Sequence, residues 1–467
     1  MNLSDGKSSL RPLEKTKNND GVYKFKKKHF PLSFWGNVLW ATPTRKRLTG
    51  NFFSLSVLQA ANYLLPLLSL PYLVRVLGPS NFGLIAFAQA FINYFVIFTD
   101  YGFNLSATRE ISIERENKDK VAEIFSSVMI IKGFFCLFSL IVLLLLLFFI
   151  PRFHNDWIIY IYAFGTVVGN AMFPVWFFQG IEKMKYTTFI NVASKLFFTI
   201  CVFIFIRNIN DYTLVPLISS MGYLIAGIIS MVVVFRNFGV KFKFSSVDTL
   251  KCQLKSSWYF FISNISISLV SGSNAFLLGL FVPNLFVGYY SAAEKLVKGS
   301  LCFVSPISGT LFPFISQLAK KSKKESLKLL KKILRFNMAL GGVISLALFV
   351  FSPFIVNFVF GSEFTESVIV LRILSAIVFL LITNDIAGMQ TMIPFGYEKA
   401  FSNIILMGSI VNILLLIILS PIFYHIGAAI SWLASEIVIT VSMFVFLKKR
   451  GIDYLSFNFN KKYENGF

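Results

Sequence analysis

The sequence predicts an all-α integral membrane protein in which 12 transmembrane helices form two parallel-repeat six-helix bundles around a central cavity. Three observations predict this class: an apolar composition, long apolar segments and a one-sided distribution of basic residues. Hydrophobic residues make up 56% of the 467 positions and charged residues only 14%, whereas soluble domains carry about 25% charged residues. This composition excludes an ordinary cytosolic enzyme, a disordered chain and a small disulfide-stapled scaffold.

The apolar segments are long enough to cross a bilayer. A hydrocarbon core about 30 Å thick requires about 20 apolar residues in a helix that rises about 1.5 Å per residue. Twelve segments meet this requirement, at roughly 51–74, 82–105, 125–150, 158–180, 187–206, 213–235, 257–281, 288–315, 335–360, 367–394, 401–420 and 425–447. An even number of spans places both termini on the same side of the membrane.

Basic residues lie almost entirely on one side of this arrangement. The connections on that side carry 36 Lys and Arg, in residues 1–50, 106–124, 182–186, 236–256, 316–335, 395–400 and 448–467. The opposite side holds only Arg75, Arg152 and Arg207. Because basic loops remain in the cytoplasm, we expect both termini to be cytoplasmic, and the net charge of +22 needs no nucleic-acid partner.

The predicted organisation has five regions. They are a basic cytoplasmic tail without regular structure (1–50), a first six-helix bundle (51–235), a cytoplasmic linker (236–256), a second six-helix bundle (257–447) and a cytoplasmic tail (448–467). Both bundles begin in the cytoplasm, so the repeat is parallel, about an axis along the membrane normal. At an offset of 205 residues, Gly83 aligns with Gly288 and Gln89 with Glu294.

Polar residues recur in the first helix of each half. Gln59 and Tyr63 stand four residues apart on one face of the first predicted span, and Asn264 and Ser268 occupy the equivalent positions of the seventh. Lipid cannot hydrogen-bond these side chains, so polar residues in spans face the bundle or a water-filled cavity. We therefore expect these four residues to line a central cavity.

Ionisable residues inside the predicted spans are candidates for function, because a charge at the centre of a helix costs about 2.5 to 3.5 kcal/mol on insertion. The basic ones are Lys132, Lys195, Lys295, Lys298 and Arg372, with Arg75 at an outer helix end. Of these, Lys295, Lys298 and Arg372 would form a positive lining that attracts a phosphate-bearing substrate. The acidic candidates, which would bind a coupling proton or sodium ion, are Asp100, Glu294, Asp385 and Glu436. Glu294 and Lys298 are four residues apart, so a local ion pair that only aids insertion is the competing interpretation.

The sequence contains no catalytic or metal-binding motif. Its four Cys and three His lack ligand or triad spacing, and no glycine cluster forms a phosphate loop. Connections on the side opposite to the basic one are no longer than about ten residues. We expect no catalytic residue, no metal and no cofactor, and the short loops disfavour a membrane enzyme that acts on lipid-linked sugars.

Several stretches resemble the Wzx-type polysaccharide flippases, the O-antigen transporters of the multidrug/oligosaccharidyl-lipid/polysaccharide exporter superfamily. They run in family order and are residues 51–91, TDYGFNLSATREIS (99–112), PVWFFQGIEKMKY (174–186), VGYYSAAEKLVKGS (287–300), LFPFIS (311–316) and FGSEFTESVIVLRILS (360–375). Each stretch is loose, but together they are specific and cover nearly all of 51–447. The departure is residues 1–50, because such proteins usually begin just before the first span.

The resemblance implies movement of an undecaprenyl-diphosphate-linked oligosaccharide, an O-antigen repeat unit, from the cytoplasmic to the periplasmic leaflet of a bacterial inner membrane by alternating access. It implies that five basic residues hold the diphosphate and any acidic sugar, namely Arg75, Lys195, Lys295, Lys298 and Arg372. It also implies that transport is open to coupling with a proton or sodium gradient. The expected partners are this lipid-linked oligosaccharide and membrane lipids, with no nucleic acid. Association with a polysaccharide polymerase stays open.

Other functions also remain open. A drug or cation exporter, or a lipid II flippase, of the same superfamily would share the fold, although more internal carboxylates and fewer internal Lys and Arg would favour the exporter. A membrane enzyme such as an O-antigen polymerase or ligase is the alternative from a different class.

Overall fold

The computed structural model describes residues 43–244, 246–301, 311–312, 315–316, 318–319 and 321–454, without the side chains of 43–64, 67, 263, 270 and 271. The chain divides into two units at Gly50. Everything below concerns the second unit, Asn51–Phe467, except that the first long helix already begins at Pro43.

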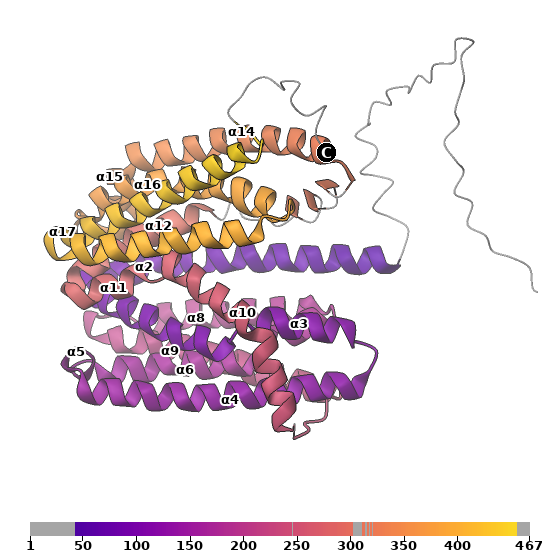
Figure 1. Ribbon diagram of the computed structural model, residues 1–467. Helices are drawn as coiled ribbons and strands as arrows, with labels where there is room; N and C mark the ends of the chain where they lie inside the picture. Colours follow the sequence, from indigo (N-terminus) through magenta and orange to yellow (C-terminus); the bar gives the residue numbers. More distant parts are fainter. Residues whose placement is uncertain are drawn as a thin grey trace, which may run out of the picture. The chain divides into compact units, whose positions relative to one another are not determined.

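The described residues form helices and turns, and no strand occurs among them (Figure 1). The helices of the first half are α2 (Pro43–Asp100), α3 (Phe103–Ile113), α4 (Lys118–Phe149), α5 (Pro151–His154), α6 (Trp157–Met172), α7 (Val175–Gly180), α8 (Met184–Phe205), η1 (Ile209–Thr213) and α9 (Leu214–Asn237). Those of the second half are α10 (Val247–Ser271), α11 (Asn274–Phe281), α12 (Asn284–Ser300), α14 (Lys323–Val350), α15 (Ser352–Phe360), η3 (Ser362–Phe364), α16 (Ser367–Asn384), η4 (Asp385–Met392, a π-helix) and α17 (Glu398–Lys449).

The chain is a multi-pass membrane protein. Eight helices of the described part are long and apolar enough to cross a membrane, or nine if the bent pair Val247–Leu269 and Asn274–Phe281 forms one span. Two of these helices contain a break in the helical backbone, α2 at Gly78 (φ 70°) and α17 at Tyr424 (φ 50°). Each break falls between two of the predicted segments, and the count of twelve spans stays a prediction.

Polar caps start three of the long helices. The Asn117 side chain accepts hydrogen bonds from two backbone N–H groups at the start of α4, and Ser246 and Ser322 each accept one at the starts of α10 and α14. The capped α14 begins at Lys323, well before the predicted span 335–360. The basic residues from Lys323 to Arg335 therefore belong to the same helix as the apolar span that follows.

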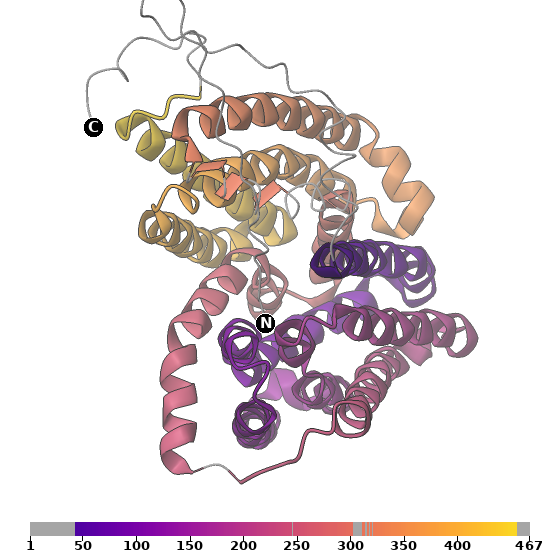
Figure 2. The ribbon, with the colours of Figure 1, turned by 90° about the vertical axis from the view of Figure 1, so that its right-hand side faces the viewer.

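Helices of each half pack mainly on one another. In the first half α9 packs along α6 and α8, and in the second half α16 packs along α12, α14 and α17 (Figures 1 and 2). Helix α10 also crosses between the halves, since it packs on α3 and α4 of the first half as well as on α17. There Ser106 and Ser257 share a hydrogen bond of 2.6 Å, and the Gln253 amide donates to Glu110 at 2.5 Å.

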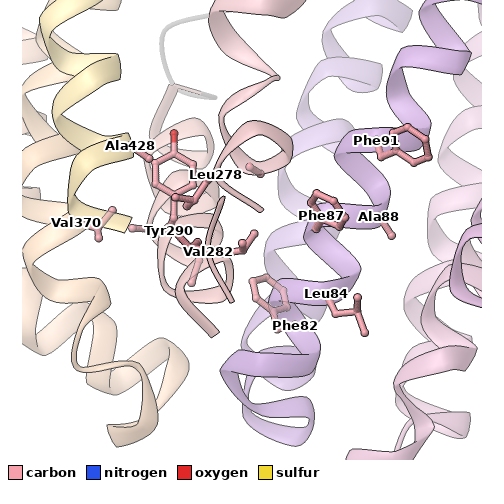
Figure 3. Packing of buried hydrophobic residues seen from close by; sticks show 14 of the residues in the cluster. Phe82, Leu84, Phe87, Ala88, Phe91, Leu278, Val282, Tyr290, Val370 and Ala428 are labelled. Carbon is pink, nitrogen blue, oxygen red and sulfur yellow. The ribbon is translucent and has the colours of Figure 1, made fainter. Parts of the chain in front are cut away.

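The two halves meet most closely where α2 crosses α12. A Cβ atom added to Gly83 would lie 1.8 Å from the Asn284 carbonyl oxygen, and one added to Gly288 would lie 1.9 Å from that of Pro79. Beside this crossing the rings of Phe82 and Phe87 from α2 face apolar residues of α11 and α12 (Figure 3). The two glycines aligned by the sequence repeat are thus the two that permit this contact.

Two arginines also join the halves at the end of the molecule that holds Gly78, here called the Gly78 end. Arg75 of α2 donates to the carbonyl oxygens of Phe358 and Val359 in the last turn of α15, where a helix leaves its carbonyls without intrahelical donors. Arg152 of α5 donates to the Val282 carbonyl at 3.0 Å and to Asn284 Oδ1 at 3.2 Å. These contacts close the Gly78 end.

The glycine crossing predicts a large effect of a single methyl group. We expect Gly83→Ala and Gly288→Ala each to lower the free energy of unfolding by about 1 to 3 kcal/mol, because the added carbon overlaps backbone that side-chain rotation cannot move. The measurement is the thermal unfolding midpoint in detergent.

Gly342→Ala in α14 is the matched control, since its Cβ would meet nothing within 4 Å. That variant should unfold at or above the wild-type temperature. Wild-type midpoints for both crossing variants would mean that the close approach is absent in the folded protein.

Candidate functional site

Three of the predicted basic residues lie together in one cavity of about 320 Å3, here called the lysine pocket. Lys195 comes from α8, and Lys295 and Lys298 come from α12. Its apolar wall includes Leu77 and Phe82, which belong to α2. A cavity of this size lies within the range of about 300 to 1,000 Å3 found for small-molecule sites.

The charges in the lysine pocket do not cancel. Lys298 forms an ion pair with Glu294 one helical turn away, with Nζ and Oε1 2.9 Å apart. Lys195 and Lys295 form no ion pair within the part of the chain that the structure describes, and Lys295 Nζ lies 4.8 Å from the centre of the Phe82 ring. The pocket therefore carries two positive charges that no carboxylate neutralises, and it can hold a doubly charged anion.

Neutral polar residues complete the lysine pocket, and the sequence predicted none of them as a site residue. They are Ser69, Gln89, Asn191, Ser194, Ser219 and Tyr223. The buried Asn191 Oδ1 has no hydrogen-bond partner in the described structure, so it can accept a hydrogen bond from a ligand. In the sequence, the only sign of these pocket residues is that each is polar within an apolar segment. Such residues are too common in these spans for the sequence alone to show which of them line a pocket.

A second cavity of about 440 Å3, here called the asparagine pocket, adjoins the first through two shared residues, Phe173 and Lys298. It contains Asp100, whose Oδ1 accepts a hydrogen bond from Lys132 Nζ at 3.1 Å and whose Oδ2 accepts one from the Asn104 amide at 2.9 Å. The Lys132 side chain is only 3% exposed. This ion pair makes the asparagine pocket close to neutral.

The polar residues predicted to line a cavity from the first and seventh spans differ in what the structure describes. Asn264 and Ser268 of α10 both line the asparagine pocket. Gln59 and Tyr63 fall within helix α2, but their side chains lie outside the described residues.

Arg75 and Arg372 do not line either pocket. Arg75 is exposed and is bound to the carbonyls of α15 at the Gly78 end. Arg372 is also exposed, donates to Ser352 Oγ at 3.0 Å and lies 5.9 Å from the Phe349 ring, in a separate groove between α14 and α16. The structure therefore gathers three of the five basic candidates and not these two arginines.

The acidic candidates occupy three kinds of environment. Asp100 and Glu294 each pair with a lysine, and Asp385 begins the π-helix η4. Glu436 of α17 is 3% exposed and accepts hydrogen bonds from Trp432 Nε1 at 3.2 Å and from the Asn384 amide at 2.9 Å. Within the described residues its partners are neutral, so its charge has no ionic counterpart.

The described residues contain no group of three or more His, Cys, Asp or Glu side chains arranged to hold a metal ion. The chemistry that the two pockets offer is binding: ammonium groups for an anion, and amides and hydroxyls for a polar neutral group.

These features define a multi-pass α-helical membrane protein with an internal cationic cavity. The chain belongs to the family described as polysaccharide biosynthesis protein, which matches residues 48–319. It is 34% identical over 401 residues, 86% of this chain and 97% of the relative, to a protein of Escherichia coli (strain K12) named as an O-antigen transporter. It is 24% identical over 383 residues, 81% of this chain and 78% of the relative, to a Haloferax volcanii protein named as a low-salt glycan biosynthesis flippase, Agl15.

Solved structures share the fold at low sequence identity. An inward-facing multidrug resistance transporter of the MATE family, in the MOP superfamily, matches with a TM-score of 0.69 at 12% identity, over 85% of this chain and 98% of that one. The lipid II flippase MurJ, in an inward closed conformation, matches with a TM-score of 0.63 at 14% identity, over 86% and 87% of the two chains. The family expected from the sequence is confirmed.

The ion pair in the asparagine pocket predicts a non-additive response to substitution. Asp100→Asn leaves the buried Lys132 ammonium facing neutral groups, so we expect it to reduce the free energy of unfolding by about 3 to 5 kcal/mol. The double variant Asp100→Asn/Lys132→Met removes both charges and should recover most of that loss, as measured by unfolding in detergent.

The exposed pair of Lys120 and Glu123, 3.0 Å apart, provides the control. Glu123→Gln should change stability by less than about 1 kcal/mol. Equal stability of the Asp100 single and double variants would show that Lys132 is not held by Asp100.

Proposed function

We propose that the protein is a flippase that moves an undecaprenyl-diphosphate-linked oligosaccharide, an O-antigen repeat unit, from the cytoplasmic to the periplasmic leaflet of the bacterial inner membrane. The relatives named as an O-antigen transporter and a glycan flippase support this proposal. A carrier is needed because an oligosaccharide that enters hydrocarbon loses water from each hydroxyl at a cost of roughly 2 to 7 kcal/mol without replacement bonds.

The observation that carries the proposal is the charge of the lysine pocket. A diphosphate diester carries one negative charge on each phosphate, and the pocket offers two ammonium groups, Lys195 and Lys295, without carboxylate partners. Lys298 remains beside them as a third donor that Glu294 holds in place. A substrate with a single positive charge, as for a cation exporter, would be repelled by this arrangement.

The proposal includes the topology expected from the sequence. Twelve spans in two six-helix bundles, 51–235 and 257–447, would place the linker 236–256 and both tails in the cytoplasm. The breaks in α2 and α17 support this count, since each lies between two predicted spans. On this topology the Gly78 end is periplasmic.

Alternating access follows from the same arrangement. The glycine crossing and the two arginine contacts close the Gly78 end, so a substrate in the pockets would reach the cytoplasmic side first. Opening of these contacts, with rocking of one half against the other, would release the substrate to the periplasm. No step of this cycle makes or breaks a covalent bond, so the protein would act as a carrier and not as an enzyme.

The proposal assigns ion coupling to Glu436 among the four acidic candidates. Asp100 and Glu294 are already neutralised by lysines, whereas Glu436 meets the neutral donors Trp432 and Asn384. Thr440 donates to Asn384 Oδ1 at 2.7 Å, which orients the amide so that its N–H group faces the carboxylate. A carboxylate held this way can gain and lose a proton, or take a cation, without breaking an ion pair.

Removal of one lysine should impair transport but not insertion. In a strain lacking the native gene, we expect Lys295→Met and Lys195→Met to reduce surface polysaccharide about tenfold or more, because a hydrogen bond to a charged group contributes about 1.5 to 3 kcal/mol. Lipid-linked single repeat units should then accumulate on the cytoplasmic face.

Lys251→Met, at an exposed position of α10, is the matched control and should leave surface polysaccharide unchanged. Wild-type polysaccharide from both pocket variants at equal protein level would remove the lysine pocket from the mechanism. Accumulation of single units in the periplasmic leaflet would instead indicate a polymerase.

The coupling assignment has its own test. In proteoliposomes, Glu436→Gln should abolish the acceleration of transport by an imposed proton or sodium gradient while leaving slow downhill exchange of the lipid. Glu123→Gln on the exposed start of α4 is the control. A gradient response equal to that of the wild type would show that Glu436 does not couple transport to an ion.

A further inference from the structure

The asparagine pocket is not used by the diphosphate site, although the two cavities adjoin. Asn93, Asn104, Asn170 and Asn264 reach it from four different helices, α2, α3, α6 and α10. Amide side chains both donate and accept hydrogen bonds, so such a cluster matches a ligand that presents several hydroxyl or acetamido groups. An ionic ligand would instead require charged side chains that are not already paired, whereas Asp100, Lys132 and Lys298 of this pocket are paired.

The amides have unused hydrogen-bonding capacity. Asn93 and Asn264 form no side-chain hydrogen bond with any residue that the structure describes. Asn104 and Asn170 each use one N–H group, on Asp100 Oδ2 at 2.9 Å and on the Thr166 carbonyl at 3.0 Å. The two structural bonds fix the orientation of these amides while their remaining polar groups stay available to a ligand.

The charge of the asparagine pocket differs from that of the lysine pocket. Its own ionic residues, Asp100 and Lys132, pair at 3.1 Å, and Lys298 at the junction pairs with Glu294. No surplus positive charge remains to attract an acidic group. The ligand that fits is therefore polar and neutral.

The position of the asparagine pocket relative to the lysine pocket also matters. In the part of α2 that follows the break at Gly78, the lysine pocket contacts residues 82–89 and the asparagine pocket contacts residues 93–100. Before the break, the lysine pocket also contacts α2 from Pro66 to Leu77. At about 1.5 Å per residue, the second pocket lies roughly 16 Å farther from the Gly78 end. On the proposed topology this is the cytoplasmic side, where the sugar of a lipid in the cytoplasmic leaflet extends from its diphosphate.

Phe173 stands at the junction of the two pockets, between the end of α6 at Met172 and Pro174, the residue that precedes α7. An aromatic ring at this position can stack on the apolar face of a pyranose. Lys298 borders both cavities, so it would contact the phosphate that is esterified to the sugar.

From these observations we infer that the asparagine pocket binds the sugar residue attached directly to the diphosphate, and that this sugar is neutral. This inference rests on the proposed function. It adds Asn93, Asn104, Asn170 and Asn264 as specificity residues, with Phe173 as the ring that supports the sugar.

The test compares three lipids on the purified full-length protein in nanodiscs. They are undecaprenyl diphosphate alone, the same lipid carrying one N-acetylglucosamine, and the same lipid carrying one galacturonic acid. We expect the wild type to bind the N-acetylglucosamine lipid about tenfold more tightly than the sugar-free lipid, and the galacturonic acid lipid no more tightly than the sugar-free one.

Asn170→Leu and Asn264→Leu should each weaken binding of the N-acetylglucosamine lipid about tenfold and leave the affinity for the sugar-free lipid unchanged. Lys295→Met should weaken both. Asn337→Leu is the matched control, because Asn337 is a buried asparagine of α14 that lines neither pocket, and it should change neither affinity.

Three results would overturn the inference: equal wild-type affinity for the neutral-sugar and sugar-free lipids, tighter binding of the acidic-sugar lipid, or asparagine variants that lose both lipids equally or neither. In each case the sugar-free lipid still binds the wild type, so the proposed function stands. If the wild type binds none of the three lipids, the proposed function fails and the inference fails with it.

Discussion

The need to neutralise or solvate every ionisable group within an apolar bundle governs the arrangement of the charged residues. A lysine among apolar helices must meet a carboxylate, reach an aqueous cavity or extend to the membrane surface. Lys132 pairs with the carboxylate of Asp100, and Lys195 and Lys295 reach the cavity of the lysine pocket. Arg75 extends to the carbonyls of α15. The two unneutralised lysines are tolerated because the cavity receives them, and that same cavity is where an anionic headgroup would be bound.

The closed Gly78 end depends on a close backbone approach together with arginine hydrogen bonds, and not on ion pairs. Gly83 and Gly288 let α2 and α12 come closer than any side chain would permit, as small residues do at membrane helix interfaces. Arg75 and Arg152 then bind carbonyl oxygens across the contact. Both arginines belong to the first half and both acceptor groups to the second. Because the acceptors are neutral, breaking these bonds leaves no carboxylate without its partner, which suits a contact that would open during transport.

Composition and apolar length predicted the helical membrane class, and the repeat spacing aligned Gly83 with Gly288, because these are properties of the sequence itself. The resemblance of several stretches predicted the family. It could not separate Lys195, Lys295 and Lys298 from Arg75 and Arg372, since all five are basic residues inside or at the end of an apolar segment. The distinction depends on which helix faces which, and Arg372 lies on the outer side of α16. The sequence did not predict three of the pocket asparagines for the same reason: each is a single polar residue, and only the packing of helices distant in sequence brings them together. They are Asn93, Asn104 and Asn170.

Lys298 connects the two parts of the proposed site. It borders both pockets, its ammonium lies 2.9 Å from Glu294, and it stands 5.9 Å from the Trp432 ring of α17. An ion pair that only aided insertion would not need its lysine to line two cavities, as Lys298 does. Because Glu294 already balances the charge of Lys298, this lysine adds a hydrogen-bond donor without adding net positive charge to the pocket. Lys298 can therefore donate to the phosphate that carries the sugar, while Lys195 and Lys295 supply the positive charge that attracts the diphosphate. The helix that carries Lys298 also carries Gly288, so a movement of α12 that opens the glycine crossing would shift the bound phosphate at the same time.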